Sequence, residues 1–344
     1  MHHRLLRCLA MPLLQQRPPR PLGGSGSRKH HRFISCRVMP LQPPLGVSGG
    51  RLFASLPSPP PLQSRREVHV WYLCPDELND QSQMNMYEEL LSPVERKYAA
   101  SMEGTTLRKD AMLSRALLRT TLSRYTDCKI DPRAFEFKKN KFGKPEILWP
   151  PDDSNVKRPL HFNISHTTSL IACGIAMQAH IGIDIEEKKR NTTKNILSLA
   201  RRYFTPSEVD HLTEISDSDA QRKEFLKLWT LKEAYVKALG MGFSGAPFNT
   251  FSIMLETGKG IRISKASKVC DDSTSGFDHL SKNWQFTLAE LNSSHYMSVC
   301  IEDDSRNEEG LENHPAPGGL KVWKTIPFVE DTLVSGTDVL KLIA

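Results

Sequence analysis

Residues 181–187 read IGIDIEE, and this strict alternation defines the two faces of one β-strand. Side chains two residues apart share a face of a strand, so three isoleucines lie on one face and Gly182, Asp184 and Glu186 on the other. The isoleucine face must be buried, which anchors the strand in a core. The two carboxylates are then about 7 Å apart, at about 3.3 Å of rise per residue. They face either water, as on an exposed edge strand, or a cation.

The longest helical pattern is EFLKLWTLKEAYVKAL at residues 224–239, followed by Gly240, a usual stop for a helix. Glu233 and Lys237 lie four residues apart on it, with Trp229 four residues before the acid. Such a Glu–Lys pair is commonly a solvated surface ion pair. The alternative is that the acid holds a ligand, and other parts of the chain have to decide between the two. Trp229 is expected to pack in the core.

Together, Asp184, Glu186 and Glu233 place two carboxylates on a rigid strand and one on a helix. Three such groups suit a hard cation such as Mg²⁺, which takes oxygen ligands. Mg²⁺ is rarely enclosed by protein alone and usually keeps waters and substrate phosphates in its shell. The carboxylates therefore predict a metal site for a substrate that carries phosphate.

Cationic candidates for that phosphate occur in three places. The loop KKNKFGK (138–144) contains four lysines, NISH (163–166) puts His166 beside Ser165, and Arg115 and Arg119 lie one turn apart on a helix. Each has a plainer interpretation: a solvated charge run, a turn histidine with its own partners, and surface arginines. The chain contains no GxxxxGK[ST] or GxGxxG motif, so a nucleotide is not held by a P-loop or a Rossmann turn.

The order of elements favours an α+β fold with two similar subdomains, because both halves run helices first and strands afterwards. Helical patterns cover 92–102, 107–125, 196–212 with a break at Pro206, and 224–239. In the second of these, an apolar stripe consists of Leu107, Ala111, Leu113, Leu117, Leu118 and Leu122. Strand patterns cover 67–73, two runs within 135–149, 161–165, 169–177, 181–187, 248–255, 283–291 and 295–302.

These patterns divide the chain into four parts. We expect a disordered leader at 1–66, an N-terminal subdomain at 67–180, a C-terminal subdomain at 181–302 and a C-terminal tail at 303–344. The tail is acidic and loop-like at first, then apolar without a clear period.

The leader carries the basic charge of the protein. It has 11 Lys and Arg residues and no Asp or Glu, whereas the other 278 residues carry 35 basic and 39 acidic side chains and a net charge of −4. Arg-rich, Ser-containing and acid-poor segments are typical of organelle transit peptides, and import into the mitochondrion is favoured over the plastid. A plain disordered tail would instead leave the protein cytosolic. The overall pI near 9.0 is no sign of a nucleic-acid surface.

Membrane and disulfide architectures are not indicated. No uninterrupted apolar run approaches the roughly 20 residues of a membrane span. The seven cysteines are odd in number, widely spaced and without a CxxC, so we expect reduced thiols, several of them buried.

Four stretches taken in order, FGKP, FNISH, GIDIE and FLKLWTLKEAYVKALG, resemble the Sfp-type 4′-phosphopantetheinyl transferases. The signature of that family is a G-[IV]-D strand followed some 40 to 50 residues later by W-x-x-K-E-[AS]-x-x-K, and here Asp184 and Glu233 are 49 residues apart. The resemblance covers about residues 67–302. It implies two α+β subdomains related by a pseudo-two-fold axis, with the active site between them.

The resemblance also implies an activity. Members transfer the phosphopantetheine arm of coenzyme A to a serine of an apo acyl- or peptidyl-carrier protein and release adenosine 3′,5′-bisphosphate. A monomer that binds coenzyme A and a carrier protein, and neither nucleic acid nor membrane, is expected. Asp184 and Glu233 match the Mg²⁺ ligands, and Glu186 matches a further acidic ligand that some members replace.

The remaining site residues are implied in the same way. Lys144, Asn163, Ser165 and His166 match positions that contact coenzyme A, with His166 near the 3′-phosphate; Arg115 matches a phosphate-contacting arginine, and Lys237 the lysine beside the pyrophosphate. Glu233, or a water on the metal, removes the serine proton, and Lys237 stabilises or protonates the departing phosphate.

One position departs from the family pattern. A basic residue expected after S-P-x-x is replaced by Tyr98, and Arg96 or Lys97 are substitutes; Lys139 and Lys141 are further candidate contacts. Two other functions stay open: a non-catalytic coenzyme A- or carrier-binding module, and another Mg²⁺-dependent phosphate enzyme such as a phosphohydrolase.

Overall fold

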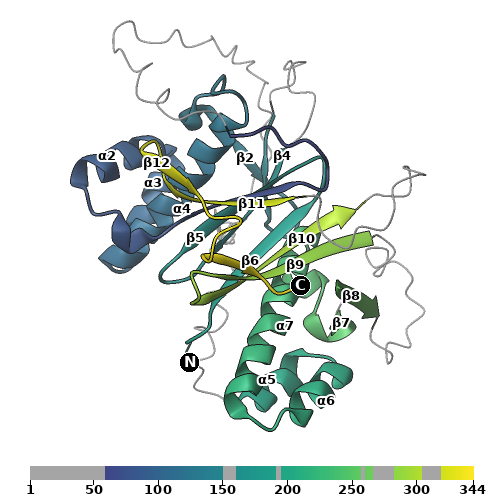
Figure 1. Cartoon of the computed structure of the whole chain (residues 1–344). Helices are drawn as coiled ribbons and strands as arrows, with labels where there is room; N and C mark the ends of the chain where they lie inside the picture. Colours follow the sequence, from purple (N-terminus) through teal and green to yellow (C-terminus); the bar gives the residue numbers. More distant parts are fainter. Residues whose placement is uncertain (1–58, 150–159, 191–194, 257–259, 266–282, 304–318) are drawn as a thin grey trace, which may run out of the picture.

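Two β-sheets form the centre of the molecule in the computed structural model, which describes residues 59–149, 160–190, 195–256, 260–265, 283–303 and 319–344 (Figure 1). The first sheet has the order β12-β11-β1-β5-β4 and the second β13-β9-β10-β6. The first consists of β1 (Val68–Leu73), β4 (Leu160–His166), β5 (Ile171–Met177), β11 (Leu320–Ile326) and β12 (Glu330–Leu333). The second consists of β6 (Ile181–Glu187), β9 (Asn283–Leu291), β10 (His295–Asp303) and β13 (Leu340–Leu342). Two hairpins, β2 (Phe137–Lys139) with β3 (Pro145–Ile147) and β7 (Phe251–Glu256) with β8 (Gly260–Lys265), complete the strands described.

Each half of the chain packs one long helix against its sheet, which confirms the predicted α+β class. The first half contains α2 (Gln81–Glu89), α3 (Pro93–Ala100) and α4 (Thr105–Arg124); the second contains α5 (Ile196–Tyr203), α6 (Pro206–Glu214), α7 (Ser218–Leu239) and α8 (Gly242–Gly245). Short 3₁₀ turns occur at Pro75–Glu77, Pro132–Ala134 and Phe248–Thr250. The long helices are α4 and α7 (Figure 1).

Local sequence signals explain where these helices begin and end. A capping box between Ser92 and Glu95, with Pro93 in the first turn, starts α3. The Asp217 side chain accepts a hydrogen bond from the Ala220 N–H and starts α7 at Ser218, where the sequence pattern predicts a start at residue 224. Gly240 ends α7 in the left-handed conformation, with φ of 66°.

The apolar stripe of α4 is buried as predicted, apart from its first member. Leu113, Leu117, Leu118 and Leu122 are all at most 1% exposed, whereas Leu107 is 47% exposed because it lies in the first turn, outside the sheet. The predicted core position of Leu107 is therefore wrong. Trp229 packs against Phe204, Phe225 and Phe248 in the core of the second half, as expected.

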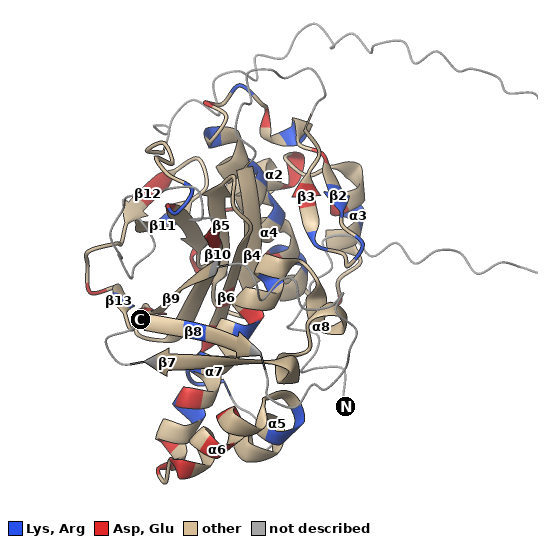
Figure 2. Cartoon of the chain, turned by 90° about the vertical axis from the view of Figure 1, so that its right-hand side faces the viewer, with Lys and Arg blue, Asp and Glu red and all other residues tan. Residues whose placement is uncertain are grey.

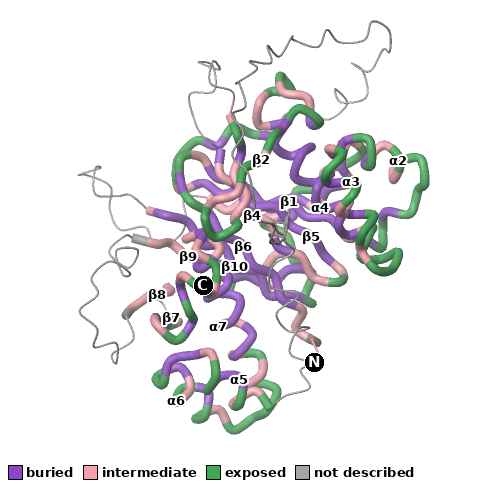
Figure 3. The backbone as a smooth tube through the Cα atoms, turned by 180° about the vertical axis from the view of Figure 1, so that it is seen from behind, coloured by how far each residue is buried: buried purple, intermediate pink, exposed green. Residues whose placement is uncertain are grey.

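Both faces of β6 are buried (Figure 3). The isoleucine face packs against Val68, Val70 and Ala172 of the first sheet, in a cluster shared by the two halves. The opposite face is covered by α7. Of the two interpretations of the IGIDIEE carboxylates, exposure to water on an edge strand is therefore wrong.

Gly182 sets how closely α7 approaches β6. A Cβ atom at this position would lie 1.9 Å from the Ala234 carbonyl oxygen and 2.4 Å from the Ala238 nitrogen. Helical backbone cannot move aside as a side chain can, so only glycine fits. The Gly182 of the GIDIE motif thus positions the strand that carries Asp184 directly against the helix that carries Glu233.

Gly182→Ala is expected to destabilise the protein by about 3 kcal/mol or more, because α7 must move off β6. Urea denaturation of the purified variant measures this change. Gly174→Ala is the matched control, since its Cβ would meet the flexible tip of Ile181 at 3.1 Å. Equal losses of stability in the two variants would contradict the close-approach explanation.

Residues 303–344 are predicted to form a tail outside both subdomains, and this prediction is wrong for residues 319–344. Strand β11 pairs in parallel with β1, and β13 pairs with β9, so this segment extends both sheets. Trp323 stacks on Trp71 with 4.5 Å between ring centroids. The apolar residues without a clear period therefore form short strands, two of which pair with strands distant in the sequence.

The leader is predicted to end at Arg66, but ordered structure begins before it. Leu62 is 2% exposed and packs in the core of the first half. The Arg65 side chain donates to the Gln178 carbonyl, and Arg66 pairs with Asp303 at 3.1 Å. Residues 59–66 thus belong to the folded part, whereas the leader predictions for residues 1–58 lie outside the described residues.

Four cysteines lie in the described ranges, and all are free thiols, with Cys173 and Cys300 buried. Among the helices described, none is both long and apolar enough to cross a membrane.

Candidate active site

Asp184, Glu186 and Glu233 gather where β6 lies against α7. The two acids of β6 lie on the same strand face as Gly182, the face that α7 covers, and Glu233 comes from α7 itself. They are 5%, 6% and 2% exposed. The structure therefore places the three predicted carboxylates close enough to influence one another electrostatically.

Lys237 is the nearest cation to Asp184. Its Nζ lies 2.6 Å from Asp184 Oδ1, and it also donates to Ser165 Oγ and to the Ile183 carbonyl, each at 3.1 Å. Of the two interpretations of Glu233 and Lys237, the solvated surface pair is therefore wrong. Lys237 reaches instead from the helix to the strand, so the row Glu233–Lys237 faces the protein interior.

Asn163 and Ser165 join the two sheets at this point. The β6 edge has backbone N–H groups without a neighbouring strand, and the Ile183 N–H donates to Asn163 Oδ1 at 2.9 Å while the Ile185 N–H donates to Ser165 Oγ at 3.1 Å. Ser165 in turn donates to Asp184 Oδ1 at 3.0 Å. Side chains of the NIS sequence in β4 thus accept the β6 hydrogen bonds that a neighbouring strand would otherwise accept. Ser165 also fixes the position of Asp184.

Burial makes the three carboxylates hard to ionise together. Burial raises the pKa of Asp184 even though Lys237 opposes the shift. Burial and then the charge of Asp184 raise the pKa of Glu186 to about 7, and the same two causes hold the pKa of Glu233 well above its ordinary range. Such a cluster is suited to accept a cation or a proton.

The donor set fits a hard metal ion in part. In the described ranges, no three Asp, Glu, His or Cys side chains converge as a ready-made metal cluster. However, Asp184 Oδ2 and Glu233 Oε1 are both buried without a hydrogen-bond partner. Two unpartnered carboxylate oxygens in one buried place are what Mg²⁺ would satisfy, together with waters and phosphate oxygens.

Arg115 and His166 form a second part of the site. Arg115 is 1% exposed and lies over the Tyr98 ring at 4.5 Å, and its Nε and one terminal nitrogen are buried without partners. Burial, then the charges of Lys237 and Arg115, lower the pKa of His166 to about 4, so its imidazole is neutral at pH 7. Two unpartnered guanidinium donors beside a neutral imidazole can bind an anion such as phosphate. Tyr98, where a basic residue was expected, instead packs on the arginine.

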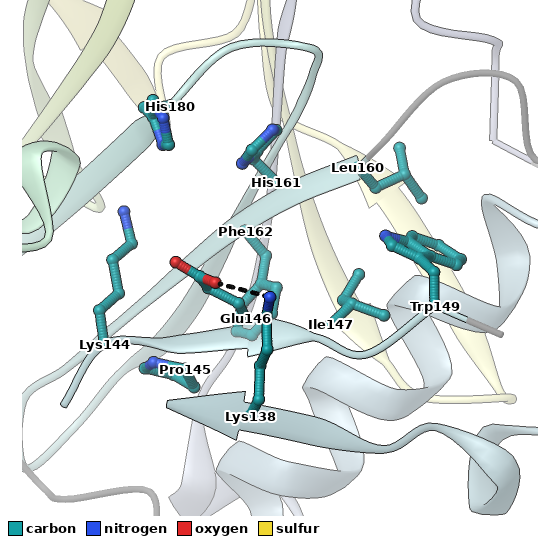
Figure 4. Close-up of a pocket in the computed structure, with 10 residues that line it drawn as sticks. All are labelled: Lys138, Lys144, Pro145, Glu146, Ile147, Trp149, Leu160, His161, Phe162 and His180. Carbon is teal, nitrogen blue, oxygen red and sulfur yellow. Dashed lines mark ion pairs between the residues drawn. The ribbon is translucent and has the colours of Figure 1, made fainter. Parts of the chain in front are cut away.

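Lys144 is not directed toward these groups. Its Nζ donates to the Ile181 carbonyl at 2.9 Å and to the Ala238 carbonyl at 3.2 Å, and burial lowers its pKa to about 8. It therefore connects the β2–β3 hairpin to β6 and to the end of α7. Its ammonium group donates to backbone carbonyls in place of a phosphate. A cavity of about 210 Å³ lies beside it, lined by Trp149, His161 and His180 but by none of the three carboxylates (Figure 4).

The other predicted cations lie apart from the carboxylates. Arg119 pairs with Glu95 at 2.8 Å and donates to carbonyls of residues 132, 133 and 135, so its predicted role in binding phosphate is replaced by a structural one. Lys138 pairs with Glu146 at 3.6 Å. Of the further candidate contacts, Arg96, Lys97 and Lys141 are exposed and Lys139 is half-buried. The lysines of β2 and its loop are visible at the edge of the first half in Figure 2.

Two residues of this region have no predicted role. Arg190, in the turn after β6, pairs with Glu186 at 2.5 Å. Lys232, beside Glu233 in the chain, is 0% exposed and donates to the Phe248 and Phe251 carbonyls while pairing with Glu208 at 2.8 Å. Glu186 and Arg190 are four residues apart, a spacing that predicts an ion pair on a helix. Here the spacing runs from a strand into a turn, where it does not predict a contact.

Comparisons with known proteins relate this chain to one family. A family model described as the 4′-phosphopantetheinyl transferase superfamily matches residues 180–300, which include all three carboxylates. The 4′-phosphopantetheinyl transferase HetI of Nostoc sp. is 33% identical over 190 residues, covering 55% of this chain and 76% of the relative. The 4′-phosphopantetheinyl transferase Sfp of Bacillus subtilis is 31% identical over 175 residues, covering 51% of this chain and 71% of the relative. The human L-aminoadipate-semialdehyde dehydrogenase-phosphopantetheinyl transferase is 23% identical over 228 residues, covering 64% and 70%.

Proposed function

This chain belongs to the 4′-phosphopantetheinyl transferases, and on that premise we propose that it moves the phosphopantetheine arm of coenzyme A onto a serine of an apo carrier protein. The serine oxygen forms a new bond to the phosphorus that carries pantetheine. The bond from that phosphorus to the adenosine-bearing phosphate breaks, and adenosine 3′,5′-bisphosphate leaves. The observation that carries the proposal is the set of buried carboxylates Asp184, Glu186 and Glu233 between β6 and α7, with the half-buried Lys237 paired to Asp184.

We propose Mg²⁺ as the metal of this reaction. Asp184 Oδ2 and Glu233 Oε1 would hold it, because both oxygens are buried and lack a partner. Glu186 is a candidate third ligand. When bound, the ion neutralises charge on the coenzyme A pyrophosphate and so assists displacement at phosphorus.

Glu233 and Lys237 have the chemistry to act on the two ends of the reaction. A serine hydroxyl is a weak nucleophile and needs a base, and the buried Glu233 carboxylate, which forms no ion pair among the described residues, is the candidate for that role. Lys237, which donates to Asp184 at 2.6 Å, is near enough to the same site to stabilise the departing phosphate. Arg115 and the neutral His166 would bind further phosphate oxygens of coenzyme A, through donors that have no protein partner on Arg115.

Incubation of the protein with coenzyme A, Mg²⁺ and a panel of apo-carriers tests the proposal. Intact-mass spectrometry should detect a gain of about 340 Da on one of the carriers, the mass of one phosphopantetheine arm transferred by metal-assisted displacement. Binding of coenzyme A without a mass change on any carrier would support a non-catalytic binding module. Release of phosphate or of phosphopantetheine into solution would support a phosphohydrolase.

We also propose that the basic leader directs import into an organelle, the mitochondrion rather than the plastid. Residues 1–58 carry nine basic and no acidic side chains, which motivates this proposal. A fluorescent protein fused after residues 1–58 is expected to leave the cytosol, and the same fusion with its arginines replaced by glutamine is expected to stay there. Uniform cytosolic fluorescence of the unaltered fusion would contradict import.

A further inference from the structure

Each carboxylate of β6 has a cation supplied by the chain itself. Lys237 pairs with Asp184 at 2.6 Å, and Arg190 pairs with Glu186 at 2.5 Å. Both acids are nearly buried, and both distances are those of close charge-assisted contacts. Glu233 differs, since it forms no ion pair among the described residues and its Oε1 has no partner. The three acids are therefore not equivalent as ligands.

The contact of Arg190 bears directly on whether Glu186 can bind a metal. The guanidinium engages Glu186 Oε2, whereas the carboxylate oxygens that are fully buried without a hydrogen-bond partner belong to Asp184 and Glu233. A metal that took Glu186 as a ligand would have to share a carboxylate with a guanidinium or displace it, at the cost of a charge-assisted contact with little water around it. Water can fill the same coordination position of Mg²⁺ without that cost.

We propose that Arg190 withholds Glu186 from the metal, so that the ion is held by Asp184 and Glu233 alone and binds weakly until substrate phosphate supplies further oxygens. This inference rests on the proposed function, because it concerns the metal of that same site. Arg190 is thus a positioning residue: it touches no reacting atom and acts through Glu186. The consequence is an order of binding in which metal and coenzyme A strengthen each other, since a site with two carboxylates depends on phosphate oxygens.

Binding of Mn²⁺ to the full-length protein without coenzyme A, followed by electron paramagnetic resonance, tests this directly. Arg190→Gln is expected to bind Mn²⁺ about tenfold more tightly than the unaltered protein, because Glu186 becomes available as a third ligand. Lys189→Gln is the matched control: it removes the same charge from the neighbouring residue, which is exposed, and is expected to change affinity less than about twofold. Equal gains in both variants would mean a general charge effect and overturn the proposal.

Two further variants identify the ligand. Glu186→Gln alone is expected to bind Mn²⁺ as the unaltered protein does, and adding it to Arg190→Gln is expected to abolish the tenfold gain. A marked loss of Mn²⁺ affinity in Glu186→Gln would show that Glu186 is a ligand already, and would overturn the proposal. If Arg190→Gln does not fold, as judged by circular dichroism, Arg190→Lys replaces it, with a smaller gain expected because lysine lacks the planar fork.

The Mn²⁺ measurement is independent of the transfer reaction. Carrier modification by the same protein samples, measured by intact mass, reports on the proposed function instead. Absence of transfer together with the expected Mn²⁺ pattern would reject the transferase proposal and keep the assignment of Arg190. Normal transfer with unchanged Mn²⁺ affinity in Arg190→Gln would keep the transferase proposal and reject the assignment of Arg190.

Discussion

Asp184→Ala and Glu233→Ala are each expected to lower kcat/KM for coenzyme A by at least about 10³-fold, the upper range for loss of one preorganised charged group. Each variant removes one of the two buried carboxylate oxygens that lack a partner and that would bind the metal. Asp184→Ala also removes the counter-ion of Lys237, which leaves a lysine with only Ser165 and a backbone carbonyl as acceptors. Steady-state kinetics with a fixed apo-carrier measures the effect.

Glu186→Ala is the matched comparison for these two variants. It removes a third acid of the same cluster, but one already paired with Arg190. We expect a loss of about tenfold or less, since Glu186 is held by Arg190 and water can complete the shell of a metal bound by Asp184 and Glu233. A loss as large as that of Asp184→Ala would make Glu186 indispensable and would contradict the division of roles between the three acids.

In this comparison, a loss of folding stability has to be separated from a loss of catalysis. Removing one member of a buried ion pair destabilises a protein by about 3–5 kcal/mol when the other charge stays buried. Asp184→Asn keeps the shape and a hydrogen-bond acceptor for Ser165, so it should lose activity with a smaller change in melting temperature. Activity that returns in Asp184→Asn would mean that the shape of the side chain, and not its charge, is what the reaction requires.

The sequence predicted best where one short stretch carries both the pattern and its chemistry. IGIDIEE forms a strand with the predicted bounds, because alternation with buried isoleucines leaves no other regular structure. The end of α7 at Gly240 followed from the need for a left-handed residue there. The carboxylates of these two elements were combined from the chemistry of a hard cation, and the family resemblance supported that combination across the 49 residues that separate Asp184 from Glu233.

The sequence predicted least where a side chain has a choice of partners. Lys144 lies in a lysine-rich loop that could bind phosphate, yet its ammonium group donates to the Ile181 and Ala238 carbonyls. Arg119 similarly donates hydrogen bonds to Glu95 and to three backbone carbonyls. Which acceptor a long cationic side chain reaches depends on the packing of distant elements. For the same reason the short strands β11 and β13 were not recognised, because their partners β1 and β9 are remote in sequence.

Lys237→Met is expected to lower kcat/KM by roughly 10²–10³-fold, which corresponds to about 2.7–4 kcal/mol of transition-state stabilisation. Methionine preserves the length and the apolar stem of the side chain but cannot donate to a departing phosphate. Were Lys237 only half of a helical surface pair, its loss would cost about 0.2–0.5 kcal/mol of stability and leave the rate alone. The contact with Asp184 at 2.6 Å already argues against that interpretation.

Lys227→Met is the control on the same helix. Lys227 pairs with Glu224 at 3.1 Å near the surface, so its replacement should shift stability slightly and leave kcat/KM unchanged. The rates have to be compared at a temperature at which circular dichroism shows both variants folded, because Lys237→Met leaves Asp184 without its cation. A normal rate in folded Lys237→Met would mean that this lysine only holds Asp184 in position. The departing phosphate would then need another cation, and Lys144 is directed to backbone carbonyls. Arg115, with two buried nitrogens that have no partner, would be the next residue to test.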